Sequence, residues 1–137
     1  MISPSDIIGP WQHSSDLTDE RRENINDLVT AVNALLAKAK AAGISLPINP
    51  KTGTQVSGEQ YGGFRPQTCS IGAPKSAHKE GLAVDLYDPA GELDGWCLRN
   101  LDQLAACGLY LEDPRHTPGW CHLTIRAPKS GKRVFVP

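Results

Sequence analysis

One short segment of the chain, SAHKEGLAVD at residues 76–85, brings together residue types that could bind a metal ion. An imidazole at His78 and a carboxylate at Asp85 stand seven residues apart, with the flexible Gly81 between them. A second imidazole, His122, follows further along the chain in an aromatic run. Catalytic zinc typically takes three protein ligands and keeps its fourth position for water. We therefore expect a zinc site formed by the two imidazoles and the carboxylate.

Strand alternation gives the proposed ligands a common direction. In the run LAVDLY at residues 82–87, Asp85 points away from the large apolar residues on either side of it. In the run WCHLTI at residues 120–125, His122 likewise points away from Cys121. We therefore expect Cys121 to pack in the core rather than to serve as a further ligand.

These residues resemble the pattern of the zinc D-Ala-D-Ala peptidases and L-Ala-D-Glu endolysins, which share a fold with the hedgehog signalling domain. The family pattern is S-x-H-x-x-G-x-A-x-D, and its fixed positions are matched here by Ser76, His78, Gly81, Ala83 and Asp85. A later aromatic-x-His element is matched by Trp120 and His122. An arginine segment of the family is matched, across an insertion, by Ser57-Gly58 and Phe64-Arg65-Pro66. The resemblance covers roughly residues 56–125.

The resemblance implies a zinc metallopeptidase that hydrolyses peptide bonds of bacterial peptidoglycan. It would act as a D-Ala-D-Ala carboxypeptidase or as an endopeptidase of the kind found among phage and prophage lysis proteins. The three residues named above would be the zinc ligands. Arg65 would bind the peptide carboxylate or the polarised carbonyl, because a forked guanidinium suits a planar anion. Ser76 and Trp120 would contact the substrate, the peptidoglycan stem peptide, and the chain would act as a monomer.

The general base is the point at which the chain departs from the family. Many members carry an acid three residues before the last histidine, where this chain has Gly119. Hedgehog-like relatives carry an acid six residues before it, where this chain has His116. We expect His116 to be the base, because imidazole is matched to neutral pH, with Glu112 as the rival. The missing acid leaves an alternative open, a zinc-stabilised domain that binds cell wall or protein without catalysis.

The elements that must position these residues are read from periodicity and from turn residues. Apolar residues at steps of three and four predict a helix over residues 18–42, ended by Gly43. The other expected elements are a helix over 93–107 and strands over 54–57, near Phe64, 82–87, 109–111, 120–125 and 133–136. Their order predicts an α+β fold with a small, mostly antiparallel sheet and flanking helices. The family resemblance implies the hedgehog/DD-peptidase version of that class.

Length and composition restrict the class of protein. The chain has 137 residues, which predicts a single domain over 1–137. Its 13 glycines and 11 prolines predict many loops. A formal net charge of −1 argues against binding to nucleic-acid phosphates. No apolar run approaches the ~18 residues typical of a membrane span, so we expect no membrane association.

The N-terminal residues and the cysteines give expectations about localisation and about disulfide bonds. The first residues show neither a basic nor an apolar targeting region, so we expect synthesis in the cytoplasm and action on the cell wall after release. The four cysteines, Cys69, Cys97, Cys107 and Cys121, are well separated and form no C-x-x-C pair. We therefore expect free buried thiols rather than disulfides or a four-cysteine zinc cluster.

Overall fold

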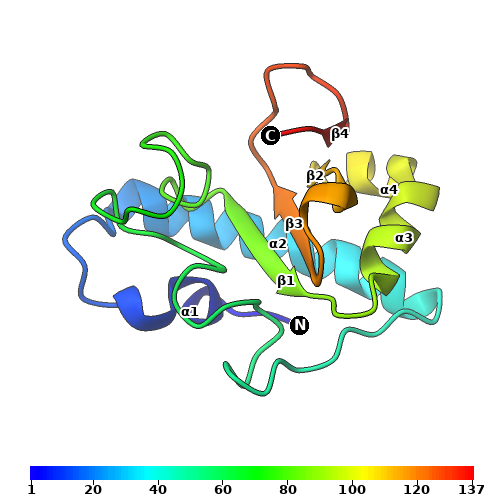
Figure 1. Ribbon diagram of the computed structural model, residues 1–137, viewed down its shortest axis with the longest axis horizontal. Helices are drawn as coiled ribbons and strands as arrows, with labels where there is room; N and C mark the ends of the chain where they lie inside the picture. The colour runs from blue at the N-terminus through cyan, green and yellow to red at the C-terminus, as the bar shows by residue number, and fades with distance from the viewer.

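The computed structural model describes residues 1–137 and has an α+β architecture, in which helices flank one small sheet (Figure 1). The helices are α1 (Pro4–Ile8), α2 (Asp19–Ala41), α3 (Glu92–Arg99) and α4 (Leu101–Ala106). The strands are β1 (Ala83–Tyr87), β2 (Tyr110–Glu112), β3 (Trp120–Thr124) and β4 (Val134–Phe135). Two short 3₁₀ turns, Gly9–Trp11 and Pro114–His116, complete the regular structure.

The long helix α2 confirms the helix that the apolar periodicity predicts over residues 18–42. The Thr18 side chain caps it by accepting a hydrogen bond from the backbone N–H of Arg21. Its apolar stripe is buried in the core, through Ile25, Leu28, Val29, Val32, Leu35 and Ala39. The helix runs behind the sheet in Figure 1 and forms one wall of that core.

The sheet has the strand order β1-β3-β2-β4. The β1–β3 and β2–β3 pairs are antiparallel, as the sequence predicts, whereas β4 pairs parallel to β2, so the sheet is mixed. Its two faces differ in character, because Val84, Leu86, Cys121 and Leu123 all belong to the hydrophobic core. Alternation places Asp85 and His122 on the opposite face.

Three expectations about local structure are wrong. The helix expected over 93–107 is two helices, broken at Asn100, whose backbone leaves the helical region and whose side chain donates to the Trp96 carbonyl. Asparagine competes in this way with helical hydrogen bonding. The strand expected over 54–57 forms only isolated bridges, one of them between Val56 and Leu86.

The third wrong expectation is the strand near Phe64, because this segment pairs with helix α1 near the N-terminus. The capping box of α1 joins Ser3 and Asp6. Phe64 lies outside any strand, and its backbone N–H donates to the Ile7 carbonyl of α1 at 2.8 Å. The backbone of this irregular segment is therefore paired with a helix and not with the sheet.

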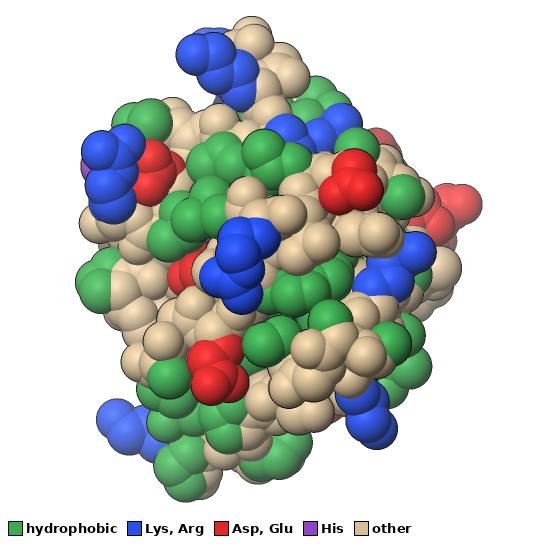
Figure 2. Space-filling model, turned by 90° about the vertical axis from the view of Figure 1, so that its right-hand side faces the viewer, with side chains coloured by type: hydrophobic (Ala, Val, Ile, Leu, Met, Phe, Trp, Pro, Cys, Tyr) green, Lys and Arg blue, Asp and Glu red, His purple; other side chains and the backbone are tan.

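The surface and the cysteines add two observations. On the side of the molecule that carries α3 and α4, basic and acidic side chains are interspersed among apolar ones (Figure 2). No helix combines the length and the hydrophobicity that a membrane crossing requires.

All four cysteines are unpaired, with Cys97 and Cys121 buried and Cys69 and Cys107 partly exposed. The expectation of burial is thus met for only two of the thiols.

A buried carboxyl group lies beneath the sheet at the start of α3. Asp94 is 5% exposed, and its Oδ1 atom has no hydrogen-bond partner. The neighbouring Asp88 accepts hydrogen bonds from the backbone N–H groups of Leu93 and Asp94 and so caps α3. Burial, together with the charges of Asp88 and Glu112, raises the pKa of Asp94 to about 7.

This raised pKa predicts a pH-dependent stability. Below the ordinary pKa of 3.8 Asp94 is protonated in both states, and between 3.8 and about 7 only the unfolded chain releases the proton. Stability is therefore lost as pH rises through that window. Asp94→Asn should remove this loss and gain on the order of 3 kcal/mol at pH 8 relative to pH 4. Urea unfolding of both proteins at the two pH values measures it.

The exposed Asp102 of α4 provides the matched control. The Asp102→Asn protein should follow the wild-type pH dependence. Equal pH dependence in the wild type and in Asp94→Asn would show that the Asp94 carboxyl is not held neutral by the fold.

Candidate metal centre

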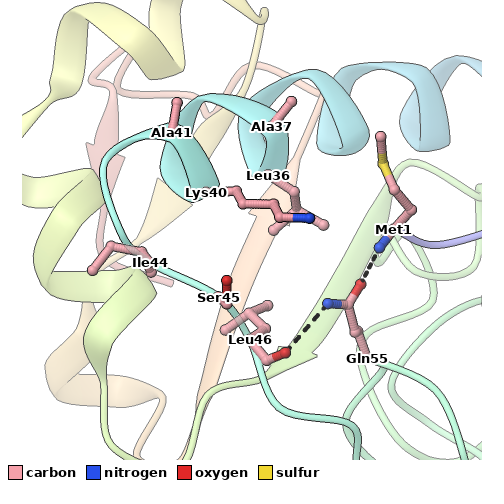
Figure 3. Close-up of a pocket in the computed structure, with 9 residues that line it drawn as sticks. All are labelled: Met1, Leu36, Ala37, Lys40, Ala41, Ile44, Ser45, Leu46 and Gln55. Carbon is pink, nitrogen blue, oxygen red and sulfur yellow. Dashed lines mark hydrogen bonds between the residues drawn. The ribbon is translucent and has the colours of Figure 1, made fainter.

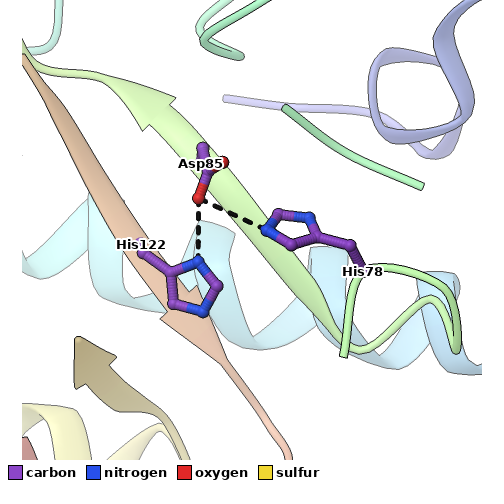
Figure 4. Close-up of side chains that lie close together, drawn as sticks. All are labelled: His78, Asp85 and His122. Carbon is purple, nitrogen blue, oxygen red and sulfur yellow. Dashed lines mark hydrogen bonds and ion pairs between the residues drawn. The ribbon is translucent and has the colours of Figure 1, made fainter. Parts of the chain in front are cut away.

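The three expected ligands meet on the face of the sheet opposite the hydrophobic core (Figure 4). Asp85 on β1 and His122 on β3 are directly paired, and His122 Nδ1 lies 2.8 Å from Asp85 Oδ1. His78, in the turn before β1, brings its Nε2 atom to 3.5 Å from the same oxygen. These ligand atoms all lie within 4.8 Å of one another, and the three residues are 4%, 9% and 9% exposed for His78, Asp85 and His122.

The orientation of His78 is set by a backbone carbonyl. Its Nδ1 atom lies 2.9 Å from the carbonyl oxygen of Gly63. A carbonyl only accepts, so Nδ1 carries the hydrogen, and in the neutral ring Nε2 is left with a lone pair. Such a second partner is the usual way in which a metal-binding histidine is held.

Gly63 can reach His78 because it has no side chain. A Cβ atom at this position would lie 2.1 Å from the Ile7 carbonyl oxygen of α1. The backbones of the irregular segment and of α1 therefore approach more closely than any other residue permits. The adjacent glycines at positions 62 and 63 are the sequence feature that could have indicated this contact.

The glycine between the ligands has a related role. Gly81 has a φ of +74°, and a Cβ atom there would lie 2.8 Å from the Arg21 carbonyl oxygen of α2. Asn24 of the same helix donates to the Glu80 carbonyl at 2.9 Å. The ligand turn is thus held on the N-terminal half of α2, and Gly81 serves close packing rather than flexibility.

The electrostatics of the cluster favour a cation at its centre. The Nε2 lone pair of a neutral His78 faces a carboxylate oxygen, and two lone pairs repel unless positive charge lies between them. Burial alone disfavours the charged form of Asp85, but positive charge on the His78 and His122 rings and hydrogen bonds from them, when the rings are protonated, hold the pKa of Asp85 well below its usual range. Ligand atoms around a tetrahedral ion with ~2.0–2.1 Å bonds lie roughly 3.3 Å apart, close to the spacings found here. These residues could therefore hold a metal ion.

Arg65 reaches the same site, as expected. Its Nη2 atom lies 3.7 Å from Asp85 Oδ2, and its side chain is 11% exposed. The Arg65 Nε–H donates to the Tyr61 carbonyl at 2.8 Å, and its backbone N–H donates to the His78 carbonyl. A Cβ atom on Gly72 would lie 2.8 Å from Arg65 Nη1, so this loop also encloses the guanidinium.

The two candidate bases lie in different surroundings. The β2–β3 register pairs Leu111 with Leu123, and its continuation places Glu112 opposite His122. Residues directly opposite one another in a sheet have Cβ atoms ~4.5–5.5 Å apart on one face. Burial raises the pKa of Glu112, and the charge of Asp85 adds to this while the His122 imidazole opposes it. His116, by contrast, is exposed at the end of a 3₁₀ turn.

The remaining expected site residues lie around the cluster. The Ser76 hydroxyl accepts a hydrogen bond from the His78 backbone N–H at 3.3 Å. Trp120 is half-buried and, by alternation, shares the face of His122. Phe135 of β4 was not anticipated, yet its ring meets the His122 ring edge-on with centroids 6.0 Å apart. Nothing local in the sequence places this tail residue beside the cluster.

A separate hollow of about 570 Å³ lies between the C-terminal half of α2 and the segment after it (Figure 3). Leu36, Ile44 and Leu46 provide much of its lining, and Gln55 bridges the Met1 amino group and the Leu46 carbonyl. It contains no acid, imidazole or thiol. The imidazoles and carboxylate that could bind a metal therefore lie in the cluster of His78, Asp85 and His122 and not in this hollow.

Comparison with known proteins adds no assignment, because no family model, no curated protein and no solved structure matches the chain.

The geometry predicts about one bound metal ion per chain. His78→Ala and His122→Ala should each lose most of it, because each removes one of three ligands. Elemental analysis of purified protein after exhaustive dialysis measures the metal content. His13→Ala is the matched control, since His13 is exposed and lies outside the cluster, and it should keep the full content. Unchanged metal in both ligand variants would refute the site.

Proposed function

We propose that the chain is a zinc-dependent peptidase that cleaves peptide bonds of bacterial peptidoglycan. The observation that best supports this proposal is the close approach of His78, Asp85 and His122. Arg65 and Glu112 lie near these three side chains. Two imidazoles and one carboxylate are a donor set that suits zinc. The pattern of the zinc D-Ala-D-Ala peptidases and L-Ala-D-Glu endolysins falls on these same ligands. Three protein ligands leave a position for water, which distinguishes catalytic from purely structural zinc sites.

The chemistry divides between the metal and the residues around it. Zinc held by His78, Asp85 and His122 would supply an acidified water and polarisation of the scissile carbonyl. The Glu112 carboxylate would accept a proton from the attacking water and return it to the departing amine. The raised pKa of Glu112, caused by burial and by the nearby Asp85 charge, brings this carboxyl closer to neutral pH, where such transfer is efficient. An acid from strand β2 thus serves where Gly119 provides none.

Arg65 stabilises negative charge on the substrate. Its guanidinium is mostly buried beside Asp85, and its Nε–H already donates to the Tyr61 carbonyl. The remaining N–H groups are directed by this anchor and can donate to the carbonyl oxygen as it gains charge. Donors fixed in advance are more effective than those that must reorganise.

The second candidate is a zinc-stabilised binding domain without catalysis. The absence of an acid three residues before His122 favours it, since that position is Gly119. Incubation of the purified protein with peptidoglycan, followed by mass spectrometry of the released fragments, separates the two candidates and identifies the bond. The His78→Ala protein is the control for contaminating hydrolases.

The assignment of the base has a direct test. Glu112→Gln should lower turnover by about 10²-fold or more, the usual scale for loss of a general base, while the metal content is unchanged. His116→Ala should have a small effect, because this side chain is exposed. Steady-state hydrolysis of a synthetic stem peptide measures both. An inactive His116→Ala beside an active Glu112→Gln would reverse the assignment.

The role of Arg65 is tested by a conservative change. Arg65→Lys keeps the positive charge but loses the planar fork, so kcat should fall while metal content and thermal unfolding stay close to wild type. Arg22→Lys on the exposed side of α2 is the matched control. Wild-type hydrolysis by Arg65→Lys would show that a point charge suffices there or that Arg65 only balances Asp85.

A further inference from the structure

Lys79, the residue directly after the first ligand, has a buried side chain whose charge has no acidic partner. The residue is 3% exposed, and none of the ion pairs of the structure includes it. Lysine is almost never buried to this extent without a partner, because its ammonium group is costly to remove from water. Position 79 is not one of the fixed positions of the S-x-H-x-x-G-x-A-x-D pattern. The ligand set therefore does not account for the burial of this side chain.

The partners of the Lys79 ammonium are backbone carbonyls of one loop, residues 66–75. The Nζ atom lies 2.7 Å from the carbonyl oxygen of Cys69, 3.4 Å from that of Gln67 and 3.5 Å from that of Gly72. An ammonium group has three N–H donors, so it can serve all three oxygens. Carbonyl oxygens directed at one point repel one another unless positive charge lies between them. The conformation of the loop therefore depends on the charge of Lys79.

The same loop connects two parts of the site. It starts directly after Arg65 and ends directly before Ser76. The Gln67 side chain closes the loop by donating to the Pro74 carbonyl at 2.8 Å, and the Gln67 backbone N–H donates to the Asp16 carboxylate at 2.8 Å. A hydrogen bond between its ends thus closes the loop, and the buried ammonium binds the residues between them.

Gly72 is the point at which the loop meets Arg65. It has a φ of +87°, and a Cβ atom there would lie 2.8 Å from Arg65 Nη1. The Gly72 carbonyl is also one of the three acceptors around the Lys79 ammonium. On its other side, the Arg65 Nε–H donates to the Tyr61 carbonyl at 2.8 Å. The guanidinium therefore lies between this carbonyl and a loop whose position Lys79 sets.

We propose that Lys79 is a positioning residue, which holds the 66–75 loop against the Arg65 guanidinium and so fixes the direction of its N–H donors. The effect on turnover rests on the proposed peptidase function, whereas the contacts themselves do not depend on the reaction. Donors that are held in place before the reaction stabilise developing charge better than donors that must reorganise. A loose loop would leave the guanidinium free to turn, and kcat would fall.

The first test measures Arg65 directly and requires no activity. The Arg65 Nε–H gives a resonance in the NMR spectrum of isotope-labelled protein, and its loss in Arg65→Lys assigns it. Its exchange with solvent should be about tenfold faster in Lys79→Met than in the wild type, the scale of one charge-assisted hydrogen bond. Lys51→Met removes an exposed lysine of another loop and should keep the wild-type rate. Equal rates in Lys79→Met and the wild type overturn the proposal.

The choice of methionine keeps the test independent of a folding defect. Methionine has nearly the length of lysine and needs no partner in a buried position, so Lys79→Met should fold. Lys79→Gln is the second variant, since it keeps an N–H donor but carries no charge, and the exchange of the Arg65 Nε–H should again be faster. A wild-type rate in a folded Lys79→Gln protein also counts against the proposal.

Gly72→Ala tests the loop from its exposed side. The added Cβ atom would displace the Arg65 guanidinium, so the same exchange should become faster. Gly53→Ala is the matched control for backbone strain, because Gly53 has a φ of +69° and a Cβ atom there would meet nothing within 4 Å. An unchanged rate in Gly72→Ala would show that the loop does not hold Arg65.

A double-mutant cycle on turnover separates positioning from a general structural role. Lys79→Met should lower kcat by about tenfold or more with metal content unchanged, since a misplaced donor stabilises less charge. In the Arg65→Lys background it should have little further effect, because the group that Lys79 positions is already altered. An equal fall in both backgrounds overturns the proposal. Absence of hydrolysis by the wild type refutes the peptidase instead, and the exchange measurement still decides the role of Lys79.

Discussion

The pairing of Asp85 with His122 across β1 and β3 is the contact on which the site depends. Because strand side chains alternate, a slip of one residue would turn His122 into the core and bring Cys121 to the metal face. The slip is opposed by the buried apolar residues of the other face, among them Leu86, Cys121 and Leu123. Core packing thus determines where the two ligands meet, although neither ligand belongs to the core.

The third ligand depends on backbone contacts rather than on the sheet. Gly63 accepts the His78 Nδ1–H, and Gly63 itself is pressed against Ile7 of α1. On the other side, Gly81 packs against α2. The first helices of the chain therefore take part in orienting a histidine more than fifty residues away. Side-chain substitution at either glycine would meet backbone atoms, which yield less readily than a flexible side chain.

The face of the sheet opposite the core gathers charges that are costly to bury one by one. Asp85, Glu112 and Arg65 lie close to two imidazoles, all with restricted access to water. Each group is acceptable there because another compensates it, and a bound cation would complete the balance. A groove lined by Lys75, Arg126 and Lys129 lies beside the cluster, so positive charge adjoins it.

The sequence alone determined those features of this protein that depend on the spacing of residues within one helix or strand. The stripe of α2, the alternation of β1 and β3, the outward direction of Asp85 and His122, and the core position of Cys121 all follow from spacing within one element. Tertiary structure decided what depends on which elements meet. Examples are the α1 contact with Gly63, the approach of Glu112 to His122 through the β2 register, and Phe135 in a parallel fourth strand. Such contacts are set by packing and by strand register between residues far apart in the sequence. The local spacing of residues therefore does not predict them.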